Sequence, residues 1–266
     1  MADLTEARIV LDPGLGADVR RERHVLQLPG GDIAADTYRP ASAAPDAALP
    51  TVLFIHGDAS AEVLADVLDW GQYRSWGEAV ASRGLCAVVL QHRSSDGLRH
   101  APSLLAELEA AIARVRDHAI PGIDAARLGV WTCSAGSSFG VAAALLASPP
   151  VAFIVSYYGF LDVRHLTARL DPNVPPDDLA AVSPAAVVEA IPCVPPTLIV
   201  RAGLDYPELN ESVDRYVAAA TGRGDTRVED HPAGHHAFDV LDADERSREL
   251  IAMTLDFMDE RLRSDG

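Results

Sequence analysis

The feature that most constrains the fold of this 266-residue chain is a series of short, continuous apolar runs separated by segments of helical length. The runs lie at residues 51–55, 86–90, 128–131, 151–157 and 197–200. Such runs, without polar alternation, are typical of strands that are buried on both faces, as in a parallel sheet. Because amphipathic helical patterns separate the runs, the chain is predicted to form a doubly wound α/β sheet.

Three further strands complete the predicted sheet. Residues 23–28 and 33–39 flank a turn rich in Pro and Gly at residues 29–32, which indicates a β-hairpin, and residues 226–230 form a last strand. We therefore expect an eight-stranded, mostly parallel sheet, in which the six strands after the hairpin alternate with helices.

The whole sheet is predicted to belong to one domain. The chain is long enough for one large α/β domain, and no internal repeat or low-complexity segment interrupts it. We expect residues 1–22 to form an irregular arm and residues 23–266 to form the domain. Residues 159–195, which hold several prolines and a short helix from residue 183, are predicted to form a small lid rather than a large helical cap.

The predicted turn around Ser134 has a sequence pattern that is typical of a reactive serine. The strand that starts at residue 128 leads into Ser134, and residues 137–146 then have helical character. A strand, a tight turn with serine at its tip and a helix form a nucleophile elbow, in which the residues two before and two after the serine must be small. Thr132 and Gly136 hold those positions, and we expect Thr132 to be crowded there. A buried serine that caps an ordinary helix is the alternative interpretation.

Polar residues follow the ends of several predicted strands, which is where ligands bind in open parallel sheets. Asp58 follows the first inner strand, Ser134 the elbow strand, Asp205 the strand at 197–200 and His236 the last strand. Serine, acid and histidine in this chain order match the catalytic triad on this kind of sheet. The joint occurrence favours a catalytic serine more strongly than any one of these residues does.

The sequence resembles the α/β-hydrolase superfamily, and within it the dienelactone-hydrolase-like and prolyl-oligopeptidase-like esterases. The resemblance extends from about residue 22 to the C-terminus, and its motifs are the elbow, Tyr38-Arg39-Pro40, His56-Gly57, Gly203-Leu204-Asp205 and Gly234-His235-His236-Ala237-Phe238. It implies the fold of that superfamily and a serine hydrolase that cleaves a carboxylic ester, lactone or thioester. Dienelactone hydrolases proper carry cysteine at the position of Ser134, and this chain departs from them there.

The resemblance also implies roles for individual residues. Ser134 is the expected nucleophile, Asp205 the acid and His236 the base, with the backbone N–H groups of Asp58 and Ala135 as the oxyanion hole. It implies a small-molecule acyl substrate and no metal or organic cofactor. Two other functions stay open: an acyl transferase that passes the same acyl group to an alcohol or amine, and a binding protein that keeps the fold without turnover.

These residue types suit acyl transfer for physical reasons. A serine hydroxyl attacks an ester poorly unless a neighbouring imidazole removes its proton. The acid keeps that imidazole in the right tautomer and stabilises the imidazolium that forms. Each backbone N–H aimed at the developing oxyanion lowers the barrier by about 3–4 kcal/mol, and the N-terminal dipole of the elbow helix adds to this effect.

Other residues compete for these roles. Cys133 as nucleophile would place Trp131, which is too bulky, at the small position of the elbow, so we expect Cys133 to be a core thiol. Asp162 is a rival to Asp205 as the acid. The glycine of the Gly203 turn permits the sharp bend after the strand and therefore favours Asp205.

A metal site is a further interpretation of the histidines after the last strand. Its candidate ligands are His231, His235 and His236, with Asp230 or Asp239. Ligands along a single loop, with no second cluster elsewhere, make this interpretation weak.

Between the two adjacent histidines, His236 is favoured as the base because Gly234 and Phe238 stand two residues before and after it, as in the resembling families.

The segment near residue 75 carries a helix signal and a cluster of aromatic residues. Ser75 and Glu78 have the spacing of a capping box, which predicts a helix that begins at Ser75 and ends at Gly84. Aromatic residues here and after residue 157 are candidates for a pocket rim, although residues at these spacings are as often in the core. They are Trp70, Tyr73, Trp76 and Tyr158.

Composition excludes some classes of partner. The chain has 22 Lys and Arg against 39 Asp and Glu, a net charge of −17, which disfavours a nucleic-acid backbone or an anionic membrane surface. Three widely spaced cysteines form neither a disulfide framework nor a metal motif. No apolar run is long enough to span a membrane, and the first ten residues lack the apolar core of a secretory signal, so we expect a cytoplasmic protein. The oligomeric state is not evident from the sequence.

Overall fold

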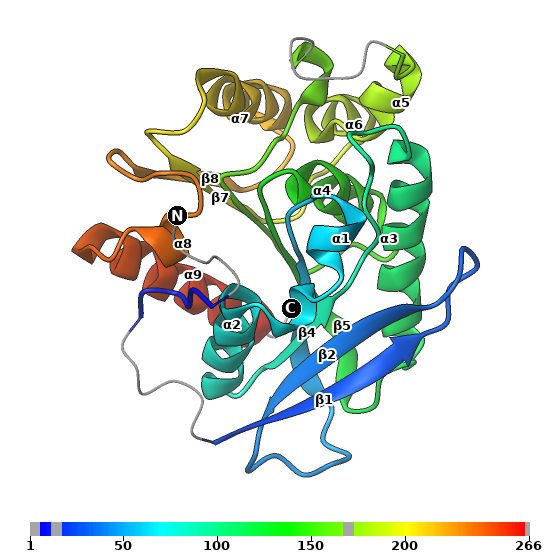
Figure 1. Ribbon diagram of the computed structural model, residues 1–266, viewed down its shortest axis with the longest axis vertical. Helices are drawn as coiled ribbons and strands as arrows, with labels where there is room; N and C mark the ends of the chain where they lie inside the picture. Colours follow the sequence, from blue (N-terminus) through cyan, green and yellow to red (C-terminus); the bar gives the residue numbers. More distant parts are fainter. Residues whose placement is uncertain (1–5, 12–17, 167–172, 264–266) are drawn as a thin grey trace.

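The computed structural model describes residues 6–11, 18–166 and 173–263, and its centre is a sheet of eight strands (Figure 1). The strands are β1 Val19–Leu26, β2 Ile33–Pro40, β3 Leu49–Ile55, β4 Cys86–Leu90, β5 Ile123–Cys133, β6 Ile154–Tyr157, β7 Thr197–Ala202 and β8 Thr226–His231. Their order is β1-β2-β4-β3-β5-β6-β7-β8. The first two pairings, β1 with β2 and β2 with β4, are antiparallel, and the others are parallel. The predicted eight-stranded, mostly parallel sheet is confirmed.

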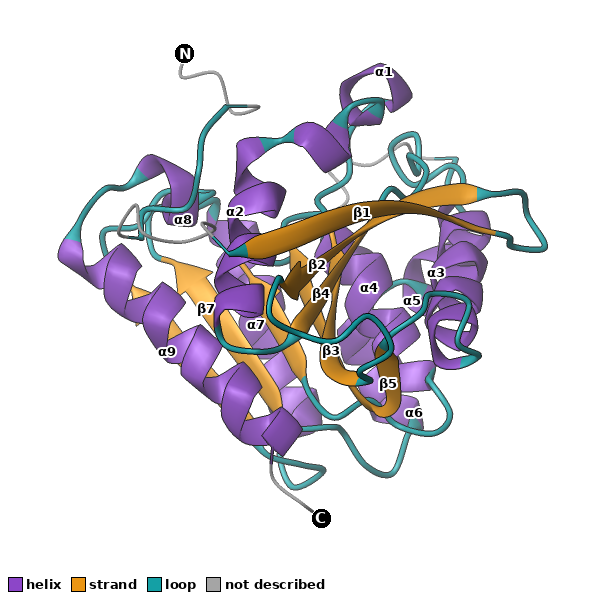
Figure 2. Ribbon diagram, turned by 90° about the horizontal axis from the view of Figure 1, so that it is seen from below, coloured by secondary structure: helices purple, strands orange, loops and turns teal. Residues whose placement is uncertain are grey.

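Helices cover both faces of the sheet (Figures 1 and 2). The α-helices are α1 Ala61–Leu64, α2 Gly71–Ser82, α3 Ala101–Arg116, α4 Gly136–Leu146, α5 Pro176–Ala181, α6 Pro184–Ala190, α7 Pro207–Ala220, α8 Phe238–Leu241 and α9 Glu245–Arg263, and the 3-10 helices are η1 Val67–Asp69 and η2 Val163–His165. On one face α3 contacts α4, α4 contacts α6, and α6 contacts α7. Helices α2 and α9 pack against the other face.

The inner strands contribute to two separate hydrophobic cores. In β3, Leu53 and Ile55 belong to the core under α3 and α4, whereas Val52 and Phe54 belong to the core under α2 and α9. Successive side chains of a strand point to opposite faces, and here both faces are covered. The strand is therefore apolar at four successive positions, from Val52 to Ile55, which is the pattern from which the sequence predicts it.

Helix α2 begins four residues before its predicted start. It spans Gly71–Ser82, and Ser75 lies inside it with its side chain buried. The Ser75 hydroxyl donates to the Gly71 carbonyl at 2.7 Å and accepts the N–H of Ile9 at 2.9 Å. The predicted capping box is therefore wrong: Ser75 holds the N-terminal segment against the helix. The predicted end is confirmed, since Gly84 follows the helix with a φ of 79°.

The structure describes parts of the predicted N-terminal arm and of the predicted lid. Strand β1 begins at Val19, inside the predicted arm, and Val10 donates its N–H to the Asp239 carbonyl at 2.8 Å. The predicted lid, residues 159–195, holds η2, α5 and α6, and residues 167–172 lie outside the described residues. None of the helices in the described ranges is both long enough and apolar enough to cross a membrane.

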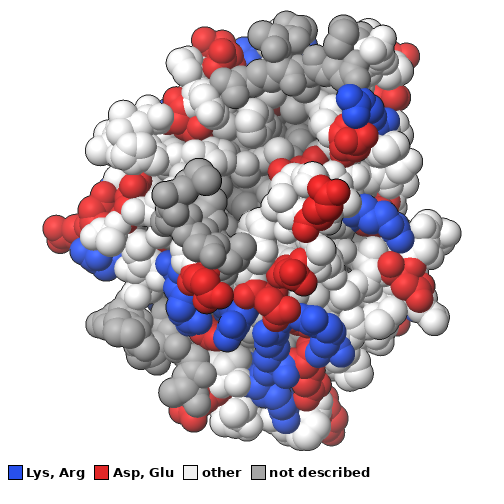
Figure 3. All heavy atoms as spheres, in the orientation of Figure 1, with Lys and Arg blue, Asp and Glu red and all other residues white. Residues whose placement is uncertain are grey.

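Charged side chains of β1 lie beside acidic partners. The Nε atoms of Arg21 and Arg23 donate to the buried carboxylate of Asp36 at 2.7 and 2.8 Å, and Arg21 also donates to Asp69 at 2.6 Å. Figure 3 shows basic and acidic side chains next to one another over this part of the molecule. The basic residues gathered on this face therefore form ion pairs instead of an isolated positive patch.

Candidate active site

Ser134 lies at the tip of a tight turn between β5 and α4. Its φ is 51°, in the left-handed region that is strained for any residue with a side chain. The backbone is held there by the Ser134 N–H, which donates to the Tyr157 carbonyl of β6 at 3.0 Å. A Cβ on Gly136 would lie 1.9 Å from the His56 carbonyl oxygen, so only glycine fits at that position. The strand, the strained serine and the helix match the predicted elbow.

Thr132 is accommodated by space on the neighbouring helix. Its hydroxyl donates to the Val155 carbonyl at 3.1 Å and lies 3.0 Å from Ser137 Oγ. Its methyl group fills the room left by Gly140 of α4, where an added Cβ would lie 2.6 Å from Thr132 Cγ2. The expected crowding at Thr132 is thus relieved by a glycine eight residues later, and threonine and glycine form a packing pair.

This pair gives a stability prediction. Gly140→Ala is expected to lower the free energy of unfolding by about 1–2 kcal/mol, because overpacking costs more than the gain in helix propensity returns. Thr132→Ser removes the clashing methyl and keeps the hydroxyl, so it should restore at least half of the loss in the double variant. Urea unfolding of the wild type, both single variants and the double variant measures this coupling. Strictly additive effects would show that the two residues do not pack as a pair.

The structure brings together Ser134, His236 and Asp205 from three different strand ends. Ser134 Oγ lies 2.8 Å from His236 Nε2, and His236 Nδ1 lies 2.5 Å from Asp205 Oδ2. The Asp205 side chain is only 1% exposed, whereas that of His236 is 37% exposed. Asp205 Oδ1 accepts the N–H of Tyr206 at 2.8 Å, so both carboxylate oxygens have a donor. A hydroxyl, an imidazole and a buried carboxylate in this order can pass a proton from the serine to the histidine.

A buried carboxylate supports the loop that carries His236. Asp239 is fully buried and accepts hydrogen bonds from Tyr158 Oη at 2.8 Å and from Gln72 Nε2 and Trp76 Nε1 at 2.9 Å each. Burial raises the pKa of Asp239, and the three donors oppose that shift. The Tyr158 ring lies 4.8 Å from the His236 ring. Asp239 and its donors therefore fix the histidine loop against α2, and the sequence offers no local pattern that identifies them.

Three of the four aromatic residues predicted for the pocket rim are buried in the core. Tyr73, Trp76 and Tyr158 are at most 3% exposed, and Trp70 stacks on Tyr73 with a centroid distance of 6.0 Å. Trp76 packs against Trp131 and donates to Asp239. None of the four lines the cavity beside Ala135. Of the two alternatives that the sequence left open for these residues, the structure places Tyr73, Trp76 and Tyr158 in the core, because aromatic spacing does not show which face of the segment is exposed.

Asp58 and Ala135, the residue that follows Ser134 in the chain, line a cavity of about 330 Å³. Ala135 is the N-cap residue of α4, so its N–H lies at the positive end of that helix. Among the hydrogen bonds of the described residues, neither the Asp58 nor the Ala135 N–H has an acceptor. The two N–H groups predicted as the oxyanion hole thus border one cavity and are available to a ligand.

The turn that presents Asp58 rests on two stacked histidines. The rings of His56 and His92 are 3.6 Å apart and nearly parallel. His92 Nε2 donates to the His56 carbonyl at 2.9 Å, and His56 Nδ1 donates to the Gly57 carbonyl at 2.7 Å. Burial lowers the pKa of His56 well below its usual value, so its ring is neutral. His56 therefore has a structural role behind the site.

Cys133, the rival to the nucleophile, and Asp162, the rival to the acid, both lie outside the triad. Cys133 is buried in the core beneath the turn, and burial raises the pKa of its thiol to about 12, so it stays protonated and inert at neutral pH. Asp162 is also buried, and its carboxylate accepts hydrogen bonds from Arg164 Nε at 2.9 Å and Arg215 Nε at 3.1 Å. Neither residue contacts His236 through any hydrogen bond of the described chain.

The histidines after β8 have separate partners. His231 Nε2 lies 2.9 Å from Ser247 Oγ, and His235 Nδ1 lies 3.0 Å from Asp242 Oδ1. In the described part of the chain no group of three or more His, Cys, Asp or Glu side chains could hold a metal ion. The structure thus gives the weak metal interpretation no support.

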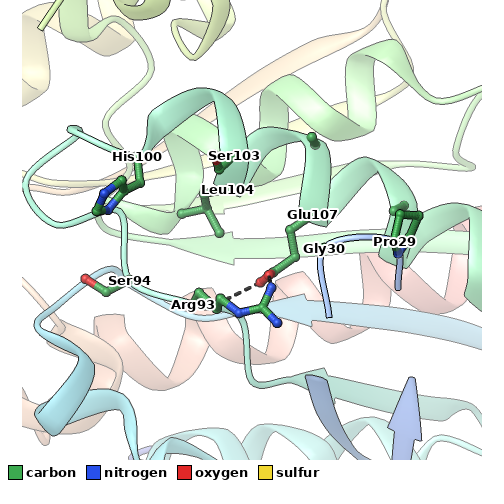
Figure 4. Close-up of a pocket in the computed structure, with 10 residues that line it drawn as sticks. Pro29, Gly30, Arg93, Ser94, His100, Ser103, Leu104 and Glu107 are labelled. Atoms are coloured by element: carbon green, nitrogen blue, oxygen red, sulfur yellow. Dashed lines mark hydrogen bonds and ion pairs between the residues drawn. The ribbon is translucent and has the colours of Figure 1, made fainter. Parts of the chain in front are cut away.

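A larger cavity of about 590 Å³ lies apart from the triad, between α3 and the turn of the β1–β2 hairpin (Figure 4). Arg93 and Glu107 form an ion pair across it, and the Arg93 N–H donates to Glu107 Oε1 at 2.9 Å. Of the residues proposed for catalysis, none lines this cavity. Its main charged groups are already paired with each other.

No protein-family model and no curated protein matches the chain. Among solved structures, a thermostable esterase from Pseudomonas putida has a TM-score of 0.73 at 17% identity, covering 94% of this chain and 85% of the other. A hyperthermophilic esterase from Pyrobaculum calidifontis has a TM-score of 0.72 at 20% identity, covering 91% and 85%. Carboxyl esterase 2 from Tuber melanosporum has a TM-score of 0.73 at 16% identity, covering 99% and 92%. The chain shares with these esterases the α/β-hydrolase fold, as predicted.

Proposed function

We propose that this chain, which has the α/β-hydrolase fold, is a serine hydrolase that cleaves a carboxylic ester, lactone or thioester through an acyl-serine intermediate. One observation carries the proposal: Ser134, His236 and Asp205 form a continuous hydrogen-bonded chain at the strand ends, beside a cavity. Fold alone would not carry it, because one fold hosts many functions. The esterase neighbours agree with this chemistry.

In the first half of the reaction, Ser134 Oγ attacks the substrate carbonyl carbon. His236 Nε2 accepts the hydroxyl proton, and Asp205 stabilises the resulting imidazolium through Nδ1. The N–H groups of Asp58 and Ala135 stabilise the negative charge that develops on the carbonyl oxygen. The bond to the leaving alcohol, or thiol, then breaks, and His236 delivers the proton to the departing atom.

In the second half, water attacks the acyl-serine carbonyl. His236 removes a proton from this water, and the same two N–H groups again stabilise the oxyanion. The bond to Ser134 breaks, His236 returns the proton to Ser134 Oγ, and a carboxylic acid leaves. The His236 side chain is 37% exposed, so its imidazole is accessible to the attacking water.

The finer assignment is a dienelactone-hydrolase-like carboxylesterase with serine as its nucleophile. Dienelactone hydrolases proper use cysteine, and here the neighbouring Cys133 is buried and protonated. We propose a small-molecule acyl substrate, and the net charge of −17 disfavours nucleic acid or an anionic membrane as partner. The three widely spaced cysteines form no disulfide framework and fit a reducing compartment, so we also propose a cytoplasmic location.

A series of p-nitrophenyl esters tests the proposal. The wild type should hydrolyse at least one of them, and Ser134→Ala should lower kcat/KM by about 10⁴-fold or more, because no other group can form the acyl-enzyme. Ser103→Ala, an exposed serine of α3 outside the catalytic cavity, is the matched control and should keep the wild-type rate. Equal activity of Ser134→Ala and the wild type would refute the proposal.

A further inference from the structure

The turn at residues 95–98 has an unusual backbone and lines the cavity that Asp58 and Ala135 border. Asp96, Gly97 and Leu98 have consecutive positive φ values of 51°, 65° and 73°. Left-handed backbone is disfavoured for residues with side chains, and for leucine in particular. Two such residues around one glycine persist only where the surrounding structure holds them. Residues 94–98 all line the cavity next to Ala135.

The Asp58 carboxylate is one of the groups that hold this turn, together with Ser94 Oγ, which accepts the N–H of Asp96 at 3.1 Å. Asp58 Oδ1 accepts the N–H of Ser95 at 3.1 Å, and Asp58 Oδ2 accepts the Ser95 hydroxyl proton. Ser95 is fully buried, and its Oγ in turn accepts the N–H of Leu98 at 3.1 Å. The Asp58 carboxylate therefore fixes the first residue of the turn, and through Ser95 it also fixes Leu98.

Leu98 connects the turn to the apolar wall of the cavity. Leu98 is 8% exposed and lines the cavity together with Phe160, Val163 and Leu166. The charged side chains among the described lining residues are Asp58 and Asp96, both acidic. An apolar wall with acidic groups at its polar end fits an uncharged aliphatic chain and disfavours an anionic one.

We infer that Asp58 is a specificity-determining residue, whose carboxylate holds the 95–98 turn as the wall of a pocket for an uncharged aliphatic acyl chain. The inference rests on the proposed function, because the pocket receives an acyl group only if Ser134 is acylated. The same residue thereby joins two parts of the site. Its N–H borders the oxyanion position, and its side chain sets the shape of the acyl pocket.

Acyl-chain profiles test the inference. For the wild type, kcat/KM on p-nitrophenyl esters should rise about fourfold for each added CH₂ from acetyl until the pocket is full, and then fall. The anionic mono-p-nitrophenyl glutarate should react at least about tenfold more slowly than p-nitrophenyl pentanoate, which has the same chain length. A flat wild-type profile, or a preference for the glutarate ester, would overturn the inference.

Ser95→Ala is the decisive variant, because it cuts the link from Asp58 to Leu98 and leaves the backbone of Asp58 in place. We expect the preference for hexanoyl over acetyl, measured as the ratio of kcat/KM values, to fall at least about tenfold, mainly through a higher KM for the hexanoyl ester. Asp58→Asn should shift the profile in the same direction. Ser103→Ala, a matched change outside the site, should leave the profile unchanged.

The outcomes separate this inference from the proposed function. If the wild type hydrolyses esters and folded Ser95→Ala keeps the wild-type chain-length profile, Asp58 does not set selectivity and the inference fails alone. A uniform loss for all acyl lengths would make the role of the link structural and would also overturn the inference. If the wild type turns over none of the esters and Ser134 is unreactive, the proposed function itself fails.

Discussion

His236→Ala is expected to lower kcat/KM for an activated ester on the order of 10⁴- to 10⁶-fold, because serine without a base barely attacks an ester. His236 Nε2 lies 2.8 Å from Ser134 Oγ, and its other nitrogen lies 2.5 Å from Asp205. The imidazole therefore connects the nucleophile to the acid, and no neighbouring side chain can take over both contacts. The measurement is kcat/KM on one p-nitrophenyl ester, with circular dichroism to confirm folding.

The adjacent histidine is the matched control for this experiment. The His235 side chain is 63% exposed, and both its N–H and its ring bond to Asp242 instead of Ser134. His235→Ala should therefore change kcat/KM by no more than about threefold. An inactive His235→Ala together with an active His236→Ala would show that the base is assigned one residue too late.

Asp205→Asn should lower kcat/KM by about 10⁴-fold while the protein stays folded, because an amide favours the wrong tautomer of His236 and cannot stabilise the imidazolium. The Asp205 carboxylate is buried and close to His236 Nδ1, which is the geometry this role requires. Substrate binding should change little, so we expect the loss mainly in kcat. Steady-state kinetics on the same ester separates kcat from KM.

Asp162→Asn is the matched control for the acid. The Asp162 carboxylate is buried and accepts hydrogen bonds from Arg164 and Arg215. Burial raises the pKa of Asp162, but the hydrogen bonds and charge of Arg164 outweigh this effect and lower it. Its replacement should lower the free energy of unfolding by about 1–3 kcal/mol and change kcat/KM less than about tenfold. If Asp162→Asn is inactive and Asp205→Asn is active, the catalytic acid is Asp162, which follows β6, and the assignment of Asp205 is wrong.

Local patterns were sufficient to predict the sheet and the positions around the turn. β3 is apolar at successive positions because Val52 and Leu53 face different cores, so its pattern indicates a buried strand without any knowledge of its neighbours. The elbow is also local, because Ser134 and Gly136 must meet steric demands within a few residues. Chain order then placed Asp205 and His236 at the same edge of the sheet, since parallel strands end there.

Features that depend on distant contacts could not be predicted in this way. Asp239 receives hydrogen bonds from Gln72 and Trp76, more than 160 residues away in sequence, and no spacing reveals such partners. For the same reason Trp76 was a pocket candidate although it is fully buried. The helix start at Gly71 was missed because the Ser75 hydroxyl bonds to the N-terminal segment instead of capping a helix.

The most direct test of the central claim is the reaction of the protein with a fluorophosphonate, followed by intact mass spectrometry and peptide mapping. If Ser134 is activated by His236, the wild type should gain one adduct, located at Ser134, and lose ester hydrolysis in parallel. Ser134→Ala should gain none. An unchanged mass of the wild type after long incubation at neutral pH, or an inactivating adduct on another residue, would contradict a catalytic Ser134.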